Sequence, residues 1–159
     1  MIDFDNMREK IVSGLRTYLN CPVISQNHDG ETPAYPFISY TVTRLMSQNN
    51  GTYGEYEDGI DRKPVTQTWS ISSHTRNNPQ SVQLICKARE WFDRVGTQYL
   101  NDNNVIVQSI GGVTNRDNLL TIGYEYRNGF DIDFWIFDEV ENPIISDGST
   151  IETVDIKQI

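Results

Sequence analysis

Two aspartates, Asp131 and Asp133, are the residues whose type and spacing most directly suggest chemistry. Side chains alternate between the two faces of a β-strand, so carboxylates two positions apart share a face. Such a pair can bind a divalent cation or act as a general acid and base. The sequence places no third ligand beside them. We therefore expect a solvated polar face here, with a metal-dependent hydrolase as the less favoured alternative.

The histidines, serines and glycines give no stronger indication of catalysis. His28 and His74 are isolated and lie in or beside expected loops, so we expect both at the surface. Ser72-Ser73-His74 is a run of sequence neighbours, whereas the members of a catalytic triad meet only in space. The phosphate-binding patterns G-x-x-x-x-G-K-[ST] and G-x-G-x-x-G are absent. The sequence therefore predicts a protein that is not an enzyme and needs no cofactor.

The composition is that of an ordinary globular chain with an acidic balance. The 159 residues, of which 37% are hydrophobic and 11% aromatic, suit a single domain over residues 1–159 with its own core. The net charge of −9 comes from 13 basic and 22 acidic residues. Binding to duplex DNA requires clustered Lys and Arg, which this balance does not suggest. The acidity favours solubility, or a surface that must not adhere to nucleic acid.

The cysteines and the amino-terminal residues indicate a cytoplasmic product. Cys21 and Cys86 have no Cys or His neighbours at metal-binding spacing, so we expect reduced thiols. The first residues lack a basic stretch followed by an apolar one, which argues against an export signal. No apolar run approaches the roughly 20 residues that span a bilayer.

The stretch that carries the two aspartates keeps one alternation from Leu120 to Ile136. Its even positions are apolar apart from Asn128, and its odd positions are mostly polar. Asn128-Gly129 is a common two-residue hairpin turn, but a hairpin there would put the apolar residues of its arms on opposite faces. We therefore predict one strand, roughly 55 Å long at about 3.3 Å per residue. A strand of this length needs a partner outside a small core.

Hydrophobic periodicity predicts the other elements. Apolar residues at helical spacing indicate a helix over about 5–19 and a second one, opened by Asn77-Asn78-Pro79, whose apolar stripe reaches Tyr99. The predicted fold class is α+β, a mostly antiparallel sheet with two helices packed on it, in the order α-β-β-β-α-β-β-β. The expected strands are Val23–Ser25, Phe37–Ser47, Val65–Thr75, Val105–Ile110, Leu120–Phe137 and Thr150–Ile156.

A long flexible loop is expected at residues 48–64, which are rich in Asn, Gly, Asp and Glu. Compact domains seldom carry structureless loops of this length unless the loop has a function. Tyr53 and Tyr56 lie in this segment and could stack on a sugar or a base, although the acidic neighbours of Tyr56 argue against nucleic acid. Both tyrosines are candidate contact residues for a partner.

Trp135 and Phe137 make the end of the long strand apolar on both faces, because they occupy odd positions. One explanation is that helices cover the second face of the strand. The other is that this end is buried against a neighbouring subunit. The two residues are therefore candidate interface residues, together with Tyr53 and Tyr56.

Two separated segments resemble one protein family. Gly123–Phe134 (GYEYRNGFDIDF), followed by Thr150–Val154 (TIETV), resembles the carboxy-terminal half of phage neck or tail terminator proteins. These are small head–tail joining proteins of tailed phages and prophages. Tyr35–Tyr40 (YPFISY) and the second predicted helix fit the same pattern, so the resemblance spans most of the chain.

The resemblance implies a structural virion protein, assembled in the host cytoplasm into a ring, typically a hexamer. Such a ring terminates the tail tube and joins it to the head connector or stopper protein, without contact with a membrane. Duplex DNA would pass through the lumen without specific binding, which suits the net negative charge. The alternative is another phage structural adaptor, such as a head-closure or minor tail protein, and a metal-dependent hydrolase is less favoured.

Overall fold

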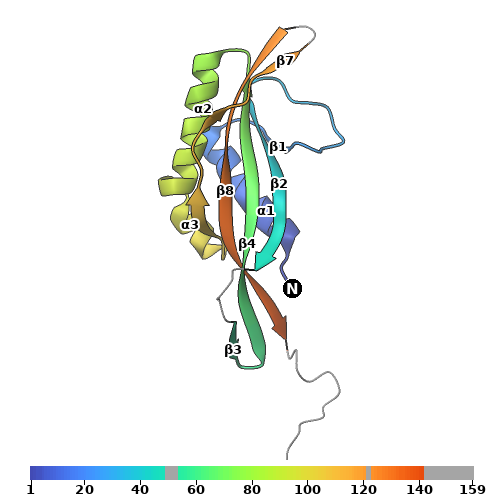
Figure 1. Cartoon of the computed structure of the whole chain (residues 1–159), viewed down its shortest axis with the longest axis vertical. Coiled ribbons are helices and arrows are strands. Elements are labelled where there is room, and N and C mark those ends of the chain that lie inside the picture. Colours follow the sequence, from blue (N-terminus) through green and yellow to red (C-terminus); the bar gives the residue numbers. More distant parts are fainter. Residues whose placement is uncertain (49–53, 121–122, 142–159) are drawn as a thin grey trace, which may run out of the picture.

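The computed structural model describes residues 1–48, 54–120 and 123–141. These residues form an α+β fold in which helices pack on one face of a mostly antiparallel sheet (Figure 1). The helical elements are α1 (Phe4–Leu19), α2 (Asn78–Glu90), the π-helical turn η1 (Trp91–Val95) and α3 (Thr97–Asp102). The strands are β1 (Val23–Ser25), β2 (Phe37–Gln48), β3 (Glu55–Glu57), β4 (Ile60–Thr75), β5 (Ile106–Ile110), β6 (Thr114–Asn115), β7 (Asn118–Leu120) and β8 (Gly123–Glu141).

The predicted fold class is confirmed, but the predicted element order is not. The described residues contain eight strands, and three of these, the short strands β3, β6 and β7, were not expected. The second helical region is divided into α2, η1 and α3. The strand expected at Thr150–Ile156 lies outside the described residues.

The pairing of β4 with β8 forms the centre of the sheet. Their antiparallel ladder runs without a break from Ile60–Glu141 to Thr75–Tyr126. The strand order is β1-β2-β4-β8-β5, with β1 parallel to β2 and the other pairs antiparallel. Figure 1 shows that the β3 hairpin and the end of β8 extend beyond the helices at the lower end of the molecule.

The prediction of one long strand through Asn128-Gly129 is confirmed. Strand β8 has 19 residues, and Asn128 and Gly129 pair with Ser73 and Ser72 inside its ladder. The predicted start of this strand was wrong, because Leu120 belongs to β7, which pairs antiparallel with the first residues of β8.

The replacement Gly129→Ala tests how closely the sheet is packed at this point. A Cβ atom would lie 2.6 Å from the carbonyl oxygen of Ile71 and 2.6 Å from a guanidinium nitrogen of Arg116. The carbonyl oxygen belongs to a strand and cannot move freely, so we expect the free energy of unfolding to fall by about 1–3 kcal/mol. Gly112→Ala is the control, because nothing lies within 4 Å of its added Cβ. Equal losses in urea unfolding of the two variants would contradict this steric explanation.

The expectation of a loop through residue 64 was wrong for its second half. Strand β3 pairs with the beginning of β4, and Asp58-Gly59 joins them as a two-residue turn. The φ angles of Asp58 and Gly59 are 51° and 79°, as type I′ hairpin turns require. Asp-Gly is itself a hairpin signal, and it outweighs the polar composition that predicted a loop. Tyr53 lies outside the described residues.

Helix α1 is delimited by its capping residues and anchored by one apolar stripe. The side chain of Asp3 accepts a hydrogen bond from the backbone N–H of Asn6 at 3.0 Å, and Asn20 ends the helix in the left-handed conformation. Ile11 and Leu15, four positions apart, are both 1% exposed. No helix in the described part of the chain is long and apolar enough to cross a membrane.

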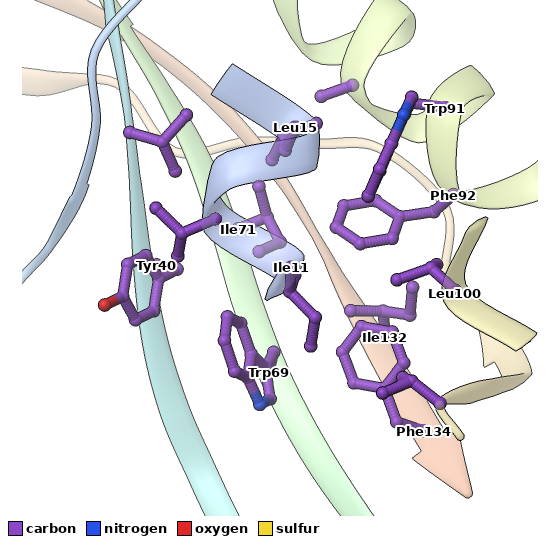
Figure 2. Packing of buried hydrophobic residues seen from close by; sticks show 14 of the residues in the cluster. Ile11, Leu15, Tyr40, Trp69, Ile71, Trp91, Phe92, Leu100, Ile132 and Phe134 are labelled. Atoms are coloured by element: carbon purple, nitrogen blue, oxygen red, sulfur yellow. The ribbon is translucent and has the colours of Figure 1, made fainter. Parts of the chain in front are cut away.

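The core lies between the helices and the covered face of the sheet (Figure 2). Trp69 stacks on Tyr40 with ring centroids 4.8 Å apart and meets the edge of Phe134 at 5.8 Å. Phe92 of η1 contacts Phe130 and Phe134. Aromatic pairs from three strands and the π-helical turn thus hold the helical layer against the centre of the sheet.

The other face of the sheet is polar at its centre, and we call this central region the open face. The buried hydrophobic residues of the helices all belong to the core cluster on the opposite side. Residues that alternate with the buried positions of β2, β4 and β8 therefore point away from the helices. The open face is defined by Thr41, Thr68, Ser70, Asp131 and Asp133.

Candidate functional site

Asp131 and Asp133 lie together on the open face, as predicted, but each is engaged by its neighbours. Asp131 forms an ion pair with Arg116 at 3.1 Å. Asp133 accepts hydrogen bonds from Thr68 at 2.6 Å and from Ser109 at 3.0 Å. Within residues 1–48, 54–120 and 123–141, no three His, Cys, Asp or Glu residues form a group that could hold a metal ion. The two carboxylates act here as acceptors that connect β8 to adjacent strands and to the segment carrying Arg116.

The expectation that His74 lies at the surface was wrong. It occupies β4 and is only 8% exposed. Its ring stacks on that of Phe37, the residue that pairs with it across β2 and β4, with centroids 4.4 Å apart and planes at 7°. His28 is half-buried, and its Nδ1 lies 2.9 Å from the carbonyl oxygen of Ser25.

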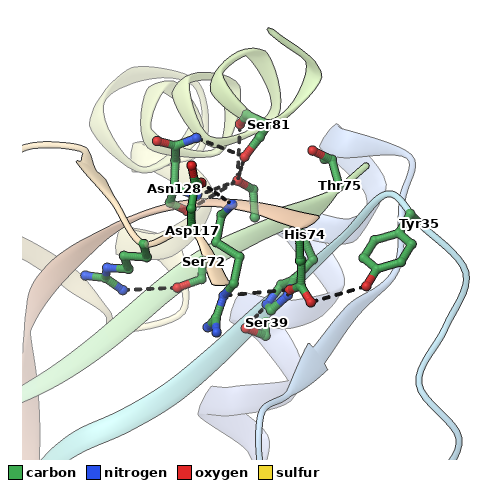
Figure 3. A network of polar contacts seen from close by, with 12 residues as sticks. Tyr35, Ser39, Ser72, His74, Thr75, Ser81, Asp117 and Asn128 are labelled. Atoms are coloured by element: carbon green, nitrogen blue, oxygen red, sulfur yellow. Dashed lines mark hydrogen bonds and ion pairs between the residues drawn. The ribbon is translucent and has the colours of Figure 1, made fainter. Parts of the chain in front are cut away.

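Both ring nitrogens of His74 have partners from other strands (Figure 3). Nε2 lies 2.8 Å from the hydroxyl oxygen of Ser39, and Nδ1 contacts a carboxylate oxygen of Glu125. A carboxylate can only accept, so Nδ1–H donates to Glu125 and Nε2 accepts from the Ser39 hydroxyl. A neutral imidazole therefore satisfies both contacts.

The electrostatic surroundings of His74 favour the same neutral form. Burial lowers the pKa of His74 below its ordinary value, and Arg127 lowers it further, while the hydrogen bond and the charge of Glu125 oppose this shift. The result is a buried polar chain that connects β2, β4 and β8.

The order Ser39–His74–Glu125 matches that of a nucleophilic triad, in which histidine takes the proton of a serine hydroxyl. Ser39 is 2% exposed and His74 is 8% exposed, so a substrate has no access to either side chain in this structure. Sequence reasoning missed the set because its members are 35 and 51 positions apart along the chain. The arrangement supports a structural role, in which one histidine links three strands.

Tyr35 extends the network to the segment that precedes β2. Its hydroxyl donates to the second carboxylate oxygen of Glu125 at 3.2 Å. Its ring stacks on Phe37 at 5.5 Å and lies under the guanidinium group of Arg76 at 4.8 Å. Burial is the main cause that raises the pKa of Tyr35, and the charge of Glu125 adds to it. Glu125 is therefore the acceptor shared by this segment and by His74.

The stability of the protein is expected to depend on pH through His74. Because its pKa is below the ordinary 6.5, the unfolded chain binds a proton at this residue before the folded chain does as the pH falls. The contribution of His74 to the free energy of unfolding should stay constant above pH 6.5 and decrease below it. In His74→Gln this decrease should be smaller between about pH 5 and 7. Urea unfolding across that range measures both slopes, and equal slopes would contradict the neutral buried histidine.

The candidate interface residues do not form one surface. Trp135 and Phe137 lie on the same side of β8 as the open face, and both are half-buried. The guanidinium group of Arg62 lies 3.9 Å above the ring of Phe137. Tyr56 is 56% exposed on β3, and the register places it on the opposite side from Phe137. The indole N–H of Trp135 is buried and has no hydrogen-bond partner among the described residues.

Comparison with known proteins gives one informative match. The sequence profile of a family described as phage neck terminator protein matches residues 9–159. No curated protein matches the chain. Among solved structures 29 chains match, and one of them aligns over 84% of this chain and 92% of its own length. Its sequence identity of 10% and TM-score of 0.40 are too low for that likeness to carry an argument.

Proposed function

The chain belongs to the phage neck terminator protein family, and from this we propose that it forms a ring that ends the tail tube at the head–tail junction. Membership over residues 9–159 makes it a structural protein of the virion neck, and this match is the observation that carries the proposal. The finer proposal is a hexamer, assembled in the host cytoplasm. Its partners would be the tail tube protein on one side and the head connector or stopper protein on the other.

The charge distribution supports a lumen through which duplex DNA passes without being held. The whole chain carries a net charge of −9. The open face presents hydroxyl groups and two carboxylates, and on this side of the sheet Arg116 is paired with Asp131 and Arg62 with Glu139. Affinity for duplex DNA comes mainly from cations that displace counterions from phosphates. DNA in a lumen lined by this face would therefore gain little affinity from the release of its counterions.

Two apolar sites are suited to contacts with neighbouring components. Trp135 and Phe137 are half-buried aromatic residues, two positions apart on the open-face side of β8. Tyr56 is exposed on the hairpin that extends beyond the helices. Tyrosine, tryptophan and phenylalanine are enriched where protein surfaces meet. We assign both sites to contacts within the neck, on different faces of the extended sheet.

Negative-stain imaging with light scattering tests this proposal on the full chain, alone and with the tail tube protein. The expected result is a ring with a central opening that caps the ends of tubes. A stable monomer in both settings would contradict it. Rings that bind the head connector but not the tube would favour a head-closure adaptor. A metal-dependent activity that Asp131→Asn with Asp133→Asn abolishes would favour the hydrolase.

A further inference from the structure

Strand β2 has an edge that the described residues leave partly uncovered. Strand β1 pairs only with residues 38–40 of β2. Between Val42 and Ser47 the strand pairs with β4 through Val42, Arg44 and Ser47, and no described strand pairs with this stretch on the other side. Leu45 and Met46 in this stretch are 55% and 47% exposed. Backbone groups without a partner along such an edge can bind another strand. The carbonyl oxygen of Leu45 is not among them, because it accepts a hydrogen bond from the side chain of Gln67 at 3.1 Å.

The opposite side of the sheet ends in a second such edge. Strand β5 pairs with β8, and no described strand pairs with its outer side. Its first residue, Ile106, is 36% exposed. Both edges contain register shifts: β5 has one, between Val107 and Ser109, and β2 has two, between Val42 and Arg44 and between Arg44 and Ser47. Irregular edges discourage pairing with an arbitrary extended chain, so each favours a partner whose shape fits.

The two edges lie at the same level along the strand direction. Pairings across the sheet connect the last residue of β5 to the beginning of the uncovered stretch of β2. Other pairings connect the first residue of β5 to the end of that stretch. The pairings are Ile110–Ile132–Trp69–Val42 at one end and Ile106–Trp135–Thr66–Ser47 at the other. Strand β5 therefore matches in level the part of β2 that β1 does not cover.

The strand directions also match. The order β2-β4-β8-β5 contains four strands in antiparallel alternation, so β5 runs opposite to β2. A neighbouring subunit related by rotation about an axis along the strands keeps its strand directions. Its β5 would therefore meet β2 of the first subunit in antiparallel orientation, and the alternation would continue from one subunit to the next.

We propose that β5 of one subunit pairs with residues 42–47 of β2 of the next, so that one continuous sheet closes the ring. This inference rests on the proposed function, because it specifies how the subunits of that ring meet. The contact uses two different edges of each subunit and is therefore heterologous, as a closed ring requires. The helices make the covered face bulkier than the open face, so a sheet that closes into a ring curves away from them. The helices then lie outside, and the open face lines the lumen.

Site-specific cross-linking tests the contact in the full chain with Cys21→Ser and Cys86→Ser. One preparation carries Met46→Cys on β2, and a second carries Ile106→Cys on β5. Each chain then carries a single cysteine, so a short bismaleimide can link only different chains. The mixture is expected to give cross-linked dimers, and each preparation alone is not.

The outcomes separate failure of this contact from failure of the ring. Rings seen by imaging without cross-links in the mixture would overturn the edge pairing and leave the ring proposal standing. Dimers from Met46→Cys alone would also overturn it, because they indicate a symmetric contact. A monomer that does not cross-link would contradict the ring itself. Protection of Met46→Cys from maleimide in a monomer would show that the chain's own segment occupies the edge, which likewise overturns the inference.

A charge placed on the edge gives an independent test with a matched control. Met46→Lys should abolish rings, because it puts an ammonium group at the strand contact. Val82→Lys should leave them intact, since Val82 is similarly exposed, at 43%, but lies on α2. Thermal unfolding of the two variants shows whether each retains the fold. Rings of Met46→Lys at the wild-type level would contradict the proposed contact.

Discussion

The replacement Phe134→Ala is expected to lower the free energy of unfolding by about 3–5 kcal/mol. Phe134 is 0% exposed, and its ring lies 5.8 Å from the rings of both Trp69 and Phe92. Removing it leaves a cavity where β8 meets β4 and the π-helical turn, and neighbours that belong to a continuous ladder cannot close that cavity freely.

Urea unfolding followed by tryptophan fluorescence measures this effect. Leu119→Ala is the control, because Leu119 is 78% exposed on β7 and its truncation should change the free energy of unfolding by less than about 0.5 kcal/mol. A loss below about 1 kcal/mol for Phe134→Ala would indicate that the site collapses around the smaller side chain. It would also show that the aromatic contacts of Phe134 do not limit the stability of the fold.

The alternation along β8 predicted its length because burial of one face imposes a period of two. Asn128 is the exception at an even position, and the structure explains it. Its side chain donates to the hydroxyl of Ser81 at 2.9 Å, and its backbone carbonyl accepts from the hydroxyl of Ser73 at 3.2 Å. The covered face is thus polar where it meets the first turn of α2. An interruption of an apolar pattern can mark the start of a packed helix rather than a turn.

The polar network around His74 could not be predicted, because it depends on register and not on local pattern. Phe37 and His74 are opposite each other only through the pairing of β2 with β4, and Glu125 reaches them from β8. Periodicity fixes which face a residue occupies but not which residue lies beside it. The same limit explains why Asp131 and Asp133 were placed correctly on one face while their partners, among them Arg116 and Thr68, remained unknown.

Glu125 links elements whose local sequences give no sign of contact. It is 8% exposed, accepts from both His74 and Tyr35, and lies 3.8 Å from the guanidinium group of Arg127. Strand β8 is central to the sheet, so its position depends on contacts with the strands beside it. In the proposed ring, the level of β5 relative to β2 is transmitted through β8 and β4. Contacts that fix this register would therefore also fix the geometry between subunits.

The replacement Glu125→Ala is expected to lower the free energy of unfolding by about 2–3 kcal/mol, because it leaves the buried Nδ1–H of His74 and the hydroxyl of Tyr35 without their acceptor. Glu125→Gln keeps an acceptor of the same size and should cost about 1 kcal/mol. Tyr35→Phe removes only one of the hydrogen bonds. A double-mutant cycle of Glu125→Ala and Tyr35→Phe in urea unfolding measures their coupling, which should exceed about 0.5 kcal/mol for groups in contact. Strictly additive losses would show that Tyr35 and Glu125 stabilise the fold independently, and the segment before β2 would then not be held by the network around His74.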